Sequence, residues 1–94
     1  MHRLPSVSAR LKQTREALGL SQAAWCRLVG ITAQAWNNYE KGTNLISLQP
    51  AIKVCIATGV SLDWIYRGLR SGLPHELAGK LVATEVSAGK ARNG

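Results

Sequence analysis

The sequence predicts an all-α fold class: a compact arrangement of five short helices followed by a short C-terminal extension. Apolar residues recur at the three-to-four spacing of a helical face, and no segment has the pattern of a strand. Serine or threonine precedes most of these runs and glycine follows them, as is typical of helix caps. With 94 residues, of which 46% are hydrophobic and 18% charged, the chain is long enough for one globular domain and too short for two.

The first two helices are predicted from a repeated apolar face and a glycine after each. Residues 8–18 form the first helix, and Gly19 ends it. Its apolar or small positions on one face are Val7, Leu11, Thr14 and Leu18. The second helix covers residues 22–29, with Ser21 as its N-cap and Gly30 as its terminator.

The third helix is predicted over residues 33–41, directly after a short turn. Thr32 precedes it as an N-cap, and Gly42 follows it as a stop. Trp36 and Tyr39, three residues apart, lie on its apolar side. The second and third helices are therefore close neighbours along the chain.

The fourth and fifth helices are predicted over residues 48–58 and 62–67. Gly59 ends the fourth helix, while Ser61 caps the fifth and Gly68 ends it. The apolar residues expected to share the buried face of the fourth helix are Leu48, Ile52, Cys55 and Ile56. The predicted helical unit therefore ends near residue 68.

The remaining residues form the C-terminal extension. We predict one domain over residues 1–68 and an extension over residues 69–94. Within the extension, residues 75–82 are predicted as a short helix because Leu77 and Leu81 are four apart. The residues after this helix are expected to form a flexible tail.

Net charge indicates a polyanionic partner. Twelve Lys and Arg against five Asp and Glu give the chain a charge of +7. Residues 1–68 carry +5 of it and residues 69–94 carry +2, so the basic charge belongs mainly to the predicted domain. This distribution favours a folded nucleic-acid-binding domain over a globule with a basic tail.

No membrane partner or secretion is expected. The longest uninterrupted aliphatic stretch, Val54 to Ala57, is far shorter than the roughly 20 apolar residues that span a bilayer. Met1 to Leu11 contains no apolar core of a secretory signal. A cytoplasmic location is therefore expected.

Neither an enzyme nor a metal site is predicted. No two of the Cys and His residues stand two to four positions apart, which zinc ligands require; these residues are His2, Cys26, Cys55 and His75. Five scattered carboxylates, without a glycine-rich phosphate loop or a nucleophile motif, leave general acid–base chemistry without candidates. We expect no cofactor.

One segment carries a specific pattern. Residues 22–41, QAAWCRLVGITAQAWNNYEK, place two helices and a short turn around Gly30 within twenty positions. Their internal apolar positions are Trp25, Val29, Ile31, Trp36 and Tyr39. Together with LKQTREALGLSQ at 11–22 and SLDWIYRG at 61–68, this segment resembles the Cro and lambda-repressor-like helix-turn-helix family of xenobiotic-response-element-type transcriptional regulators.

The resemblance implies roles for individual residues. Residues 33–41 would be the recognition helix, which enters the major groove of DNA with its N-terminal part against base edges. The residues implied to contact bases are Gln34, Asn38, Asn37 and Ala33. The residues implied to contact phosphates are Gln22, Thr32, Lys41, Arg27 and Lys12. Arg15 and Glu40 would form a structural ion pair between the first helix and the end of the recognition helix.

The predicted function is that of a sequence-specific, double-stranded-DNA-binding transcriptional regulator, most simply a repressor. One recognition helix contacts too few base pairs for specificity, so a homodimer on a palindromic operator is expected. The expected partner surface consists of the fifth helix and the segment after Gly68. The alternative is an antitoxin that masks a partner toxin and autoregulates its operon. A controller protein or prophage switch would differ only in genomic context.

Overall fold

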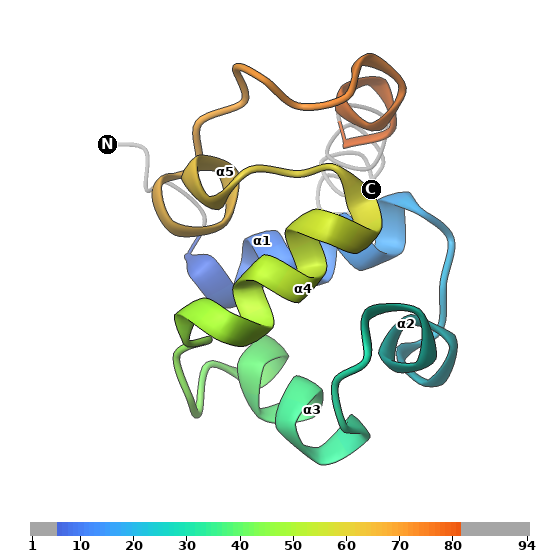
Figure 1. Cartoon of the computed structure of the whole chain (residues 1–94), viewed down its shortest axis with the longest axis vertical. Coiled ribbons are helices and arrows are strands. Elements are labelled where there is room, and N and C mark those ends of the chain that lie inside the picture. Colours follow the sequence, from blue (N-terminus) through green and yellow to red (C-terminus); the bar gives the residue numbers. More distant parts are fainter. Residues whose placement is uncertain (1–5, 82–94) are drawn as a thin grey trace, which may run out of the picture.

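The computed structural model describes residues 6–81, and all regular structure in this range is helical (Figure 1). The helices are α1 (Val7–Ala17), α2 (Gln22–Val29), α3 (Ala33–Lys41), α4 (Leu48–Thr58) and α5 (Leu62–Arg67), and residues 75–81 are also helical. This arrangement confirms the predicted all-α fold class. The predicted flexible tail and the last residue of the predicted helix 75–82 lie outside the described residues.

Side-chain caps explain why the helices begin where they do. The hydroxyls of Ser21, Thr32 and Ser61 each accept a hydrogen bond from a backbone N–H three residues later, at 3.2, 3.2 and 3.0 Å. Helices α2, α3 and α5 accordingly have the predicted bounds, and so does α4, although Ser47 before it makes no capping hydrogen bond with its side chain. Helix α1 begins at Val7, one residue before the predicted start, because Ser6 supplies the cap to the N–H of Ala9 at 3.3 Å.

Three indole rings form the centre of the hydrophobic core. Trp25 and Trp36 are fully buried and Trp64 is 2% exposed. The rings of Trp25 and Trp36 lie 5.1 Å apart between centroids and are tilted by 49°, an arrangement favourable for aromatic pairs. Helices α2 and α3 are therefore joined through two large side chains at their centres.

Two buried polar residues of α1 join it to α5. Arg10 is 4% exposed and donates from Nε to the carbonyl oxygen of Ile65 at 2.9 Å. Thr14 accepts a hydrogen bond from Trp64 Nε1 at 2.9 Å and donates to the Arg10 carbonyl at 2.7 Å. These hydrogen bonds offset part of the cost of burying the two side chains, and burial lowers the pKa of the Arg10 guanidinium.

The buried face of α4 differs from the prediction. Ala51 and Val54 are the fully buried residues of this helix, and Cys55 is half-buried. Three residues predicted to lie on the buried face are instead exposed: Leu48, Ile52 and Ile56. The prediction was wrong because α4 has apolar residues on every side, so periodicity does not select a face, and the core takes the smaller side chains there.

The first part of the C-terminal extension shares the core of the helical domain. Leu77 and Leu81 are buried within the same hydrophobic cluster, and Leu73 packs against it. Arg70 lies over the ring of Trp64, with its guanidinium carbon 5.7 Å from the centroid. Figure 1 shows α2 and α3 at one end of the molecule, the helical residues 75–81 at the other, and α4 crossing between them.

The packing of α4 predicts that two truncations affect the free energy of unfolding differently. Val54→Ala should lower the free energy of unfolding by about 1 to 3 kcal/mol, because it leaves a cavity in the core. Ile56→Ala should change it by about 0.5 kcal/mol or less, since that side chain is 81% exposed. Urea unfolding of both variants measures the difference, and a larger loss for Ile56→Ala would contradict the observed packing.

Candidate nucleic-acid interface

The α2–α3 unit is held by a tight turn. Gly30 takes a left-handed conformation with φ of 75°, and its N–H donates to the carbonyl of Cys26 at 2.9 Å. The N–H of Ile31 donates to the same carbonyl at 3.2 Å. Because non-glycine residues rarely adopt this conformation, Gly30 allows α2 to end abruptly and α3 to begin three residues later.

An ion pair joins α1 to the end of α3. Arg15 Nε lies 2.7 Å from Glu40 Oε2, and Arg15 Nη2 donates to Oε1 at 3.1 Å. The remaining Arg15 nitrogen, Nη1, donates to the carbonyl of Leu20 at 2.8 Å. The side chains of Arg15 and Glu40 are 12% and 5% exposed, so this two-point contact is largely removed from water. The ion pair expected from the sequence is present.

Two further donors complete the set around this carboxylate. Gln22 Nε2, at the start of α2, donates to Glu40 Oε1 at 3.2 Å. Trp36 Nε1, one turn earlier in α3, donates to Oε2. We call Glu40, Arg15, Gln22 and Trp36 the Glu40 cluster. It links three helices through one buried negative charge.

The protonation state of the cluster follows from these contacts. Burial alone would raise the pKa of Glu40, but hydrogen bonds from Arg15, Trp36 and Gln22 outweigh it, so this pKa is lower than usual for glutamate. The hydrogen bond to Glu40 raises the pKa of Arg15. Because the pKa of Glu40 is lower in the folded state, the stabilisation is present above the unfolded value of about 4.3 and is lost as the pH falls through the folded value.

The outward side of α3 carries the residues expected to contact bases. Ala33 and Gln34, in the first turn, are exposed, while Asn37 and Asn38 are half-buried. No hydrogen bond to another described residue occupies the side-chain amides of these three polar residues. Donors and acceptors of this face are therefore available to a ligand, whereas Trp36 on the opposite side is buried.

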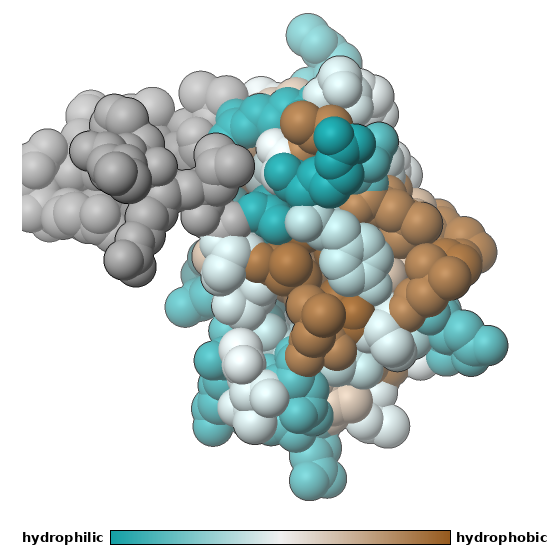
Figure 2. Space-filling view, turned by 90° about the vertical axis from the view of Figure 1, so that its left-hand side faces the viewer, coloured by the Kyte–Doolittle hydropathy of each residue, from teal (hydrophilic) through white to brown (hydrophobic). Residues whose placement is uncertain are grey.

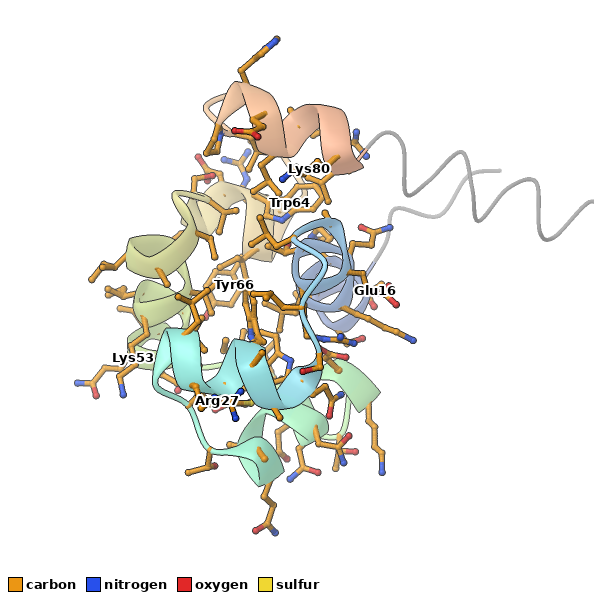
Figure 3. The ribbon with its side chains drawn as sticks, turned by 90° about the vertical axis from the view of Figure 1, so that its right-hand side faces the viewer. Glu16, Arg27, Lys53, Trp64, Tyr66 and Lys80 are labelled. Carbon is orange, nitrogen blue, oxygen red and sulfur yellow. The ribbon has the colours of Figure 1, made fainter. Side chains whose placement is uncertain are left out.

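The residues expected to contact phosphates are more dispersed. Lys12, Arg27 and Lys41 are exposed on three different helices, and Figure 3 shows Arg27 on α2. Thr32 uses its hydroxyl oxygen to cap α3. Gln22 is half-buried, and its side-chain nitrogen donates to Glu40. Its side-chain oxygen has no hydrogen-bond partner among the described residues.

Three contacts at or beside the site were not predicted from the sequence. The pairing of Trp36 with Glu40 has a recognisable signal, since the two residues are four apart on one helix. The pairing of Gln22 with Glu40 has none, because the two are brought together only by the crossing of α2 and α3. Lys53 of α4 was also missed: its Nζ donates to the carbonyl of Gly30 at 3.2 Å and so supports the turn.

The described residues show little that resembles catalytic machinery. A pocket of about 290 Å³ lies between the start of α1 and the end of α3. Its lining contains no carboxylate, imidazole or thiol; the residues are Ser6, Val7, Ser8, Tyr39, Gly42, Asn44 and Leu45. Within residues 6–81, no three side chains of His, Cys, Asp or Glu meet as potential metal ligands, and no helix has the length and apolarity to cross a bilayer.

Comparisons with known proteins agree with the α2–α3 geometry. The sequence profile of a family described as helix-turn-helix matches residues 11–65. The chain is also 34% identical over 68 residues to an uncharacterized transcriptional regulator in the ATPase CF(0) region of Rhodospirillum rubrum. That match covers 72% of this chain and 63% of the relative. No solved structure matches the chain significantly.

The Glu40 cluster predicts a strong energetic coupling. Arg15→Ala or Glu40→Ala alone should lower the free energy of unfolding by about 3 to 5 kcal/mol, because each leaves a buried charge without its partner. The double variant should lose less than either single variant. Chemical denaturation of the four proteins at neutral pH gives the coupling energy.

The exposed pair Asp63–Arg67 is the matched control. Its atoms are 3.4 Å apart and its side chains are 59% and 67% exposed, so its coupling should not exceed about 0.5 kcal/mol. Equal coupling energies for the two pairs would contradict the assignment of Glu40 as a buried structural charge.

Proposed function

Because this chain belongs to the helix-turn-helix family, we propose that it binds double-stranded DNA as a transcriptional regulator, with α3 in the major groove. The observation that carries the proposal is the pairing of an exposed polar face on α3 with an opposite side fixed by the Glu40 cluster. A recognition helix must be held at a fixed angle while its outward side chains stay free for bases. The family match covers this whole unit.

The proposed base contacts lie within the first six residues of α3. Gln34 is the first candidate, because a carboxamide offers one donor and one acceptor that match N6 and N7 of adenine. Asn38 and Asn37 are the next candidates, one turn further along the helix. Ala33 suits an apolar contact with the methyl group of thymine.

The proposed phosphate contacts fix the register of the protein on the duplex. Lys12, Arg27 and Lys41 supply positive charge around the α2–α3 unit, and Thr32 and Gln22 lie at helix N-termini, where backbone N–H groups favour anions. Since Gln22 also contacts Glu40, we propose that it acts through its oxygen or through its helix N-terminus.

The finer function that we propose is repression by a cytoplasmic homodimer on a palindromic operator. A dimer doubles the number of base pairs contacted, which one short helix needs for specificity. The name of the Rhodospirillum rubrum relative supports the regulatory role. An antitoxin that masks a toxin and autoregulates its operon would use the same DNA interface, and the same first experiment, selection of duplexes from a random library, applies to both.

Gln34→Ala should remove discrimination at one or two base pairs in each half-site. A bidentate amide–adenine contact contributes about 1 to 3 kcal/mol of discrimination. Because Gln34 is exposed and alanine favours helix, the melting temperature should stay nearly unchanged. Binding to a set of single-base variants of the selected duplex measures the effect, and an unchanged ranking would show that Gln34 does not contact a base.

Affinity for DNA should fall steeply with salt, and Lys41→Ala should reduce the logarithmic slope by about one for each site contacted. Lys80→Ala is the matched control, because it removes the same charge at the end of the molecule far from α3 (Figure 3). Titrations between low and physiological salt measure both slopes. Equal slopes for the two variants would exclude a phosphate contact by Lys41.

A further inference from the structure

Helix α4 carries an exposed apolar face. Leu48, Ile52 and Ile56 are 55%, 39% and 81% exposed, and their four-residue spacing places them in one line along the helix. This line lies on a different side of α4 from the buried Ala51 and Val54. We call these three residues the α4 face. In Figure 2 the front of Figure 1, where α4 lies, is turned to the right-hand edge, and hydrophobic side chains are exposed along that edge.

Two more large hydrophobic side chains are exposed on segments that adjoin α4. Leu45, in the loop before α4, is 71% exposed, and Leu28, on the neighbouring helix α2, is 52% exposed. Five of the six exposed large hydrophobic side chains among the described residues are therefore on α4 or on segments next to it, and the sixth is Leu69. Grouping of this kind marks an interaction surface more often than scattered exposed leucines do.

We propose that the α4 face packs against the α4 face of a second copy of this chain. This inference rests on the proposed function, since it supplies the dimer that a palindromic operator requires. The face is suited to its own copy because helix α4 has no carboxylate and a single charged residue, Lys53. The α4 face offers an acidic partner little positive charge to bind. Two copies of this +7 chain can contact each other through the α4 face with little like-charge repulsion.

The one charge of α4 is held beside the face. Lys53 Nζ donates to the carbonyl oxygen of Gly30 at 3.2 Å, so the ammonium group is directed toward the turn between α2 and α3 (Figure 3). A central apolar strip with a charge at its rim is the usual composition of a protein interface. Lys53 therefore does not oppose its own copy across the centre of the contact.

Helix α5, which the sequence suggested as the partner surface, offers less. Trp64 and Ile65 are buried in the core of the same chain. The exposed residues of α5, Asp63 and Arg67, form an ion pair with each other at 3.4 Å. Of the segment after Gly68, Leu77 and Leu81 are also buried, which leaves Leu69 as its exposed large hydrophobic residue within residues 69–81.

The position of α4 is compatible with simultaneous binding of two copies to one duplex. In Figure 1, α3 lies at the lower end of the molecule and α4 crosses its front. A two-fold axis parallel to the vertical of that view, in front of α4, brings the two α4 helices together and leaves both α3 helices at the same end. This is the arrangement that a palindromic site needs.

The size of the face predicts a weak dimer. Helix α4 has 11 residues and is about 16 Å long at 1.5 Å per residue. A contact confined to a helix of that length buries less surface than the roughly 1,200 Å² that stable complexes bury. We therefore expect association to be strengthened when two copies occupy adjacent half-sites.

The test compares Ile52→Glu with Leu69→Glu in the full chain. Both residues are 39% exposed, and both substitutions replace an aliphatic side chain with the same charge. Sedimentation equilibrium over a range of concentrations measures dimerisation without DNA. Gel-shift titrations with a duplex selected from a random library, and with its isolated half-site, measure cooperativity. Ile52→Glu should weaken dimerisation about 30-fold and abolish cooperativity, while half-site affinity stays within about twofold.

Leu69→Glu should behave as the unmodified chain in both assays. Ile56→Lys is the second variant on the α4 face. Because the Ile56 side chain is 81% exposed, this substitution leaves the core untouched, and it decides the outcome if circular dichroism shows that Ile52→Glu is unfolded. Unchanged dimerisation in the folded variants of the α4 face, dissociation by Leu69→Glu instead, or a chain that is monomeric in solution and non-cooperative on DNA would overturn the proposal. Failure to select any duplex would contradict the proposed function alone, because sedimentation still decides the dimer surface.

Discussion

The orientation of α3 depends on one buried carboxylate. Glu40 is nearly removed from water, and an ionised carboxylate in that position is tolerated only when donors surround it. Arg15 from α1, Gln22 from α2 and Trp36 from α3 itself supply them, so three helices must meet at one point for the charge to be satisfied. A shift of α3 along or around its axis would break several of these hydrogen bonds together. On the opposite side of α3, the side-chain amides have no hydrogen-bond partner among residues 6–81.

Much of the backbone could be predicted from the sequence, because the signals that bound these helices are local. A serine or threonine before each of α2, α3 and α5 and a glycine after each fix their ends within a few residues of chain. The buried face of α4 could not be predicted, since that helix is apolar on all sides and only its neighbours decide which side they cover. The burial of Arg10 could not be predicted either, because its partner, the carbonyl of Ile65, is 55 residues away in the sequence.

The candidate site could likewise be predicted only in part. Arg15 and Glu40 were expected from a family resemblance, and the exposure of Gln34 follows from its place opposite Trp36 on the helix. The additional bonds of Glu40 to Gln22 and Trp36 depend on how the helices pack: the indole at the centre of α3 brings its N–H to the carboxylate, and the crossing of α2 and α3 brings Gln22 there. We propose two binding surfaces, the polar side of α3 for bases and the apolar face of α4 for a second copy.

Contact between the outward side of α3 and DNA is tested most directly by nuclear magnetic resonance. The full chain, labelled with ¹⁵N, is titrated with a duplex that it selects from a random library. We expect the largest shifts at the side-chain amides of Gln34, Asn37 and Asn38 and at the backbone N–H groups that begin α2 and α3. The Trp36 indole N–H should change little because it stays bonded to Glu40. Largest shifts in α5 or in residues 75–81, with α3 unaffected, would contradict it.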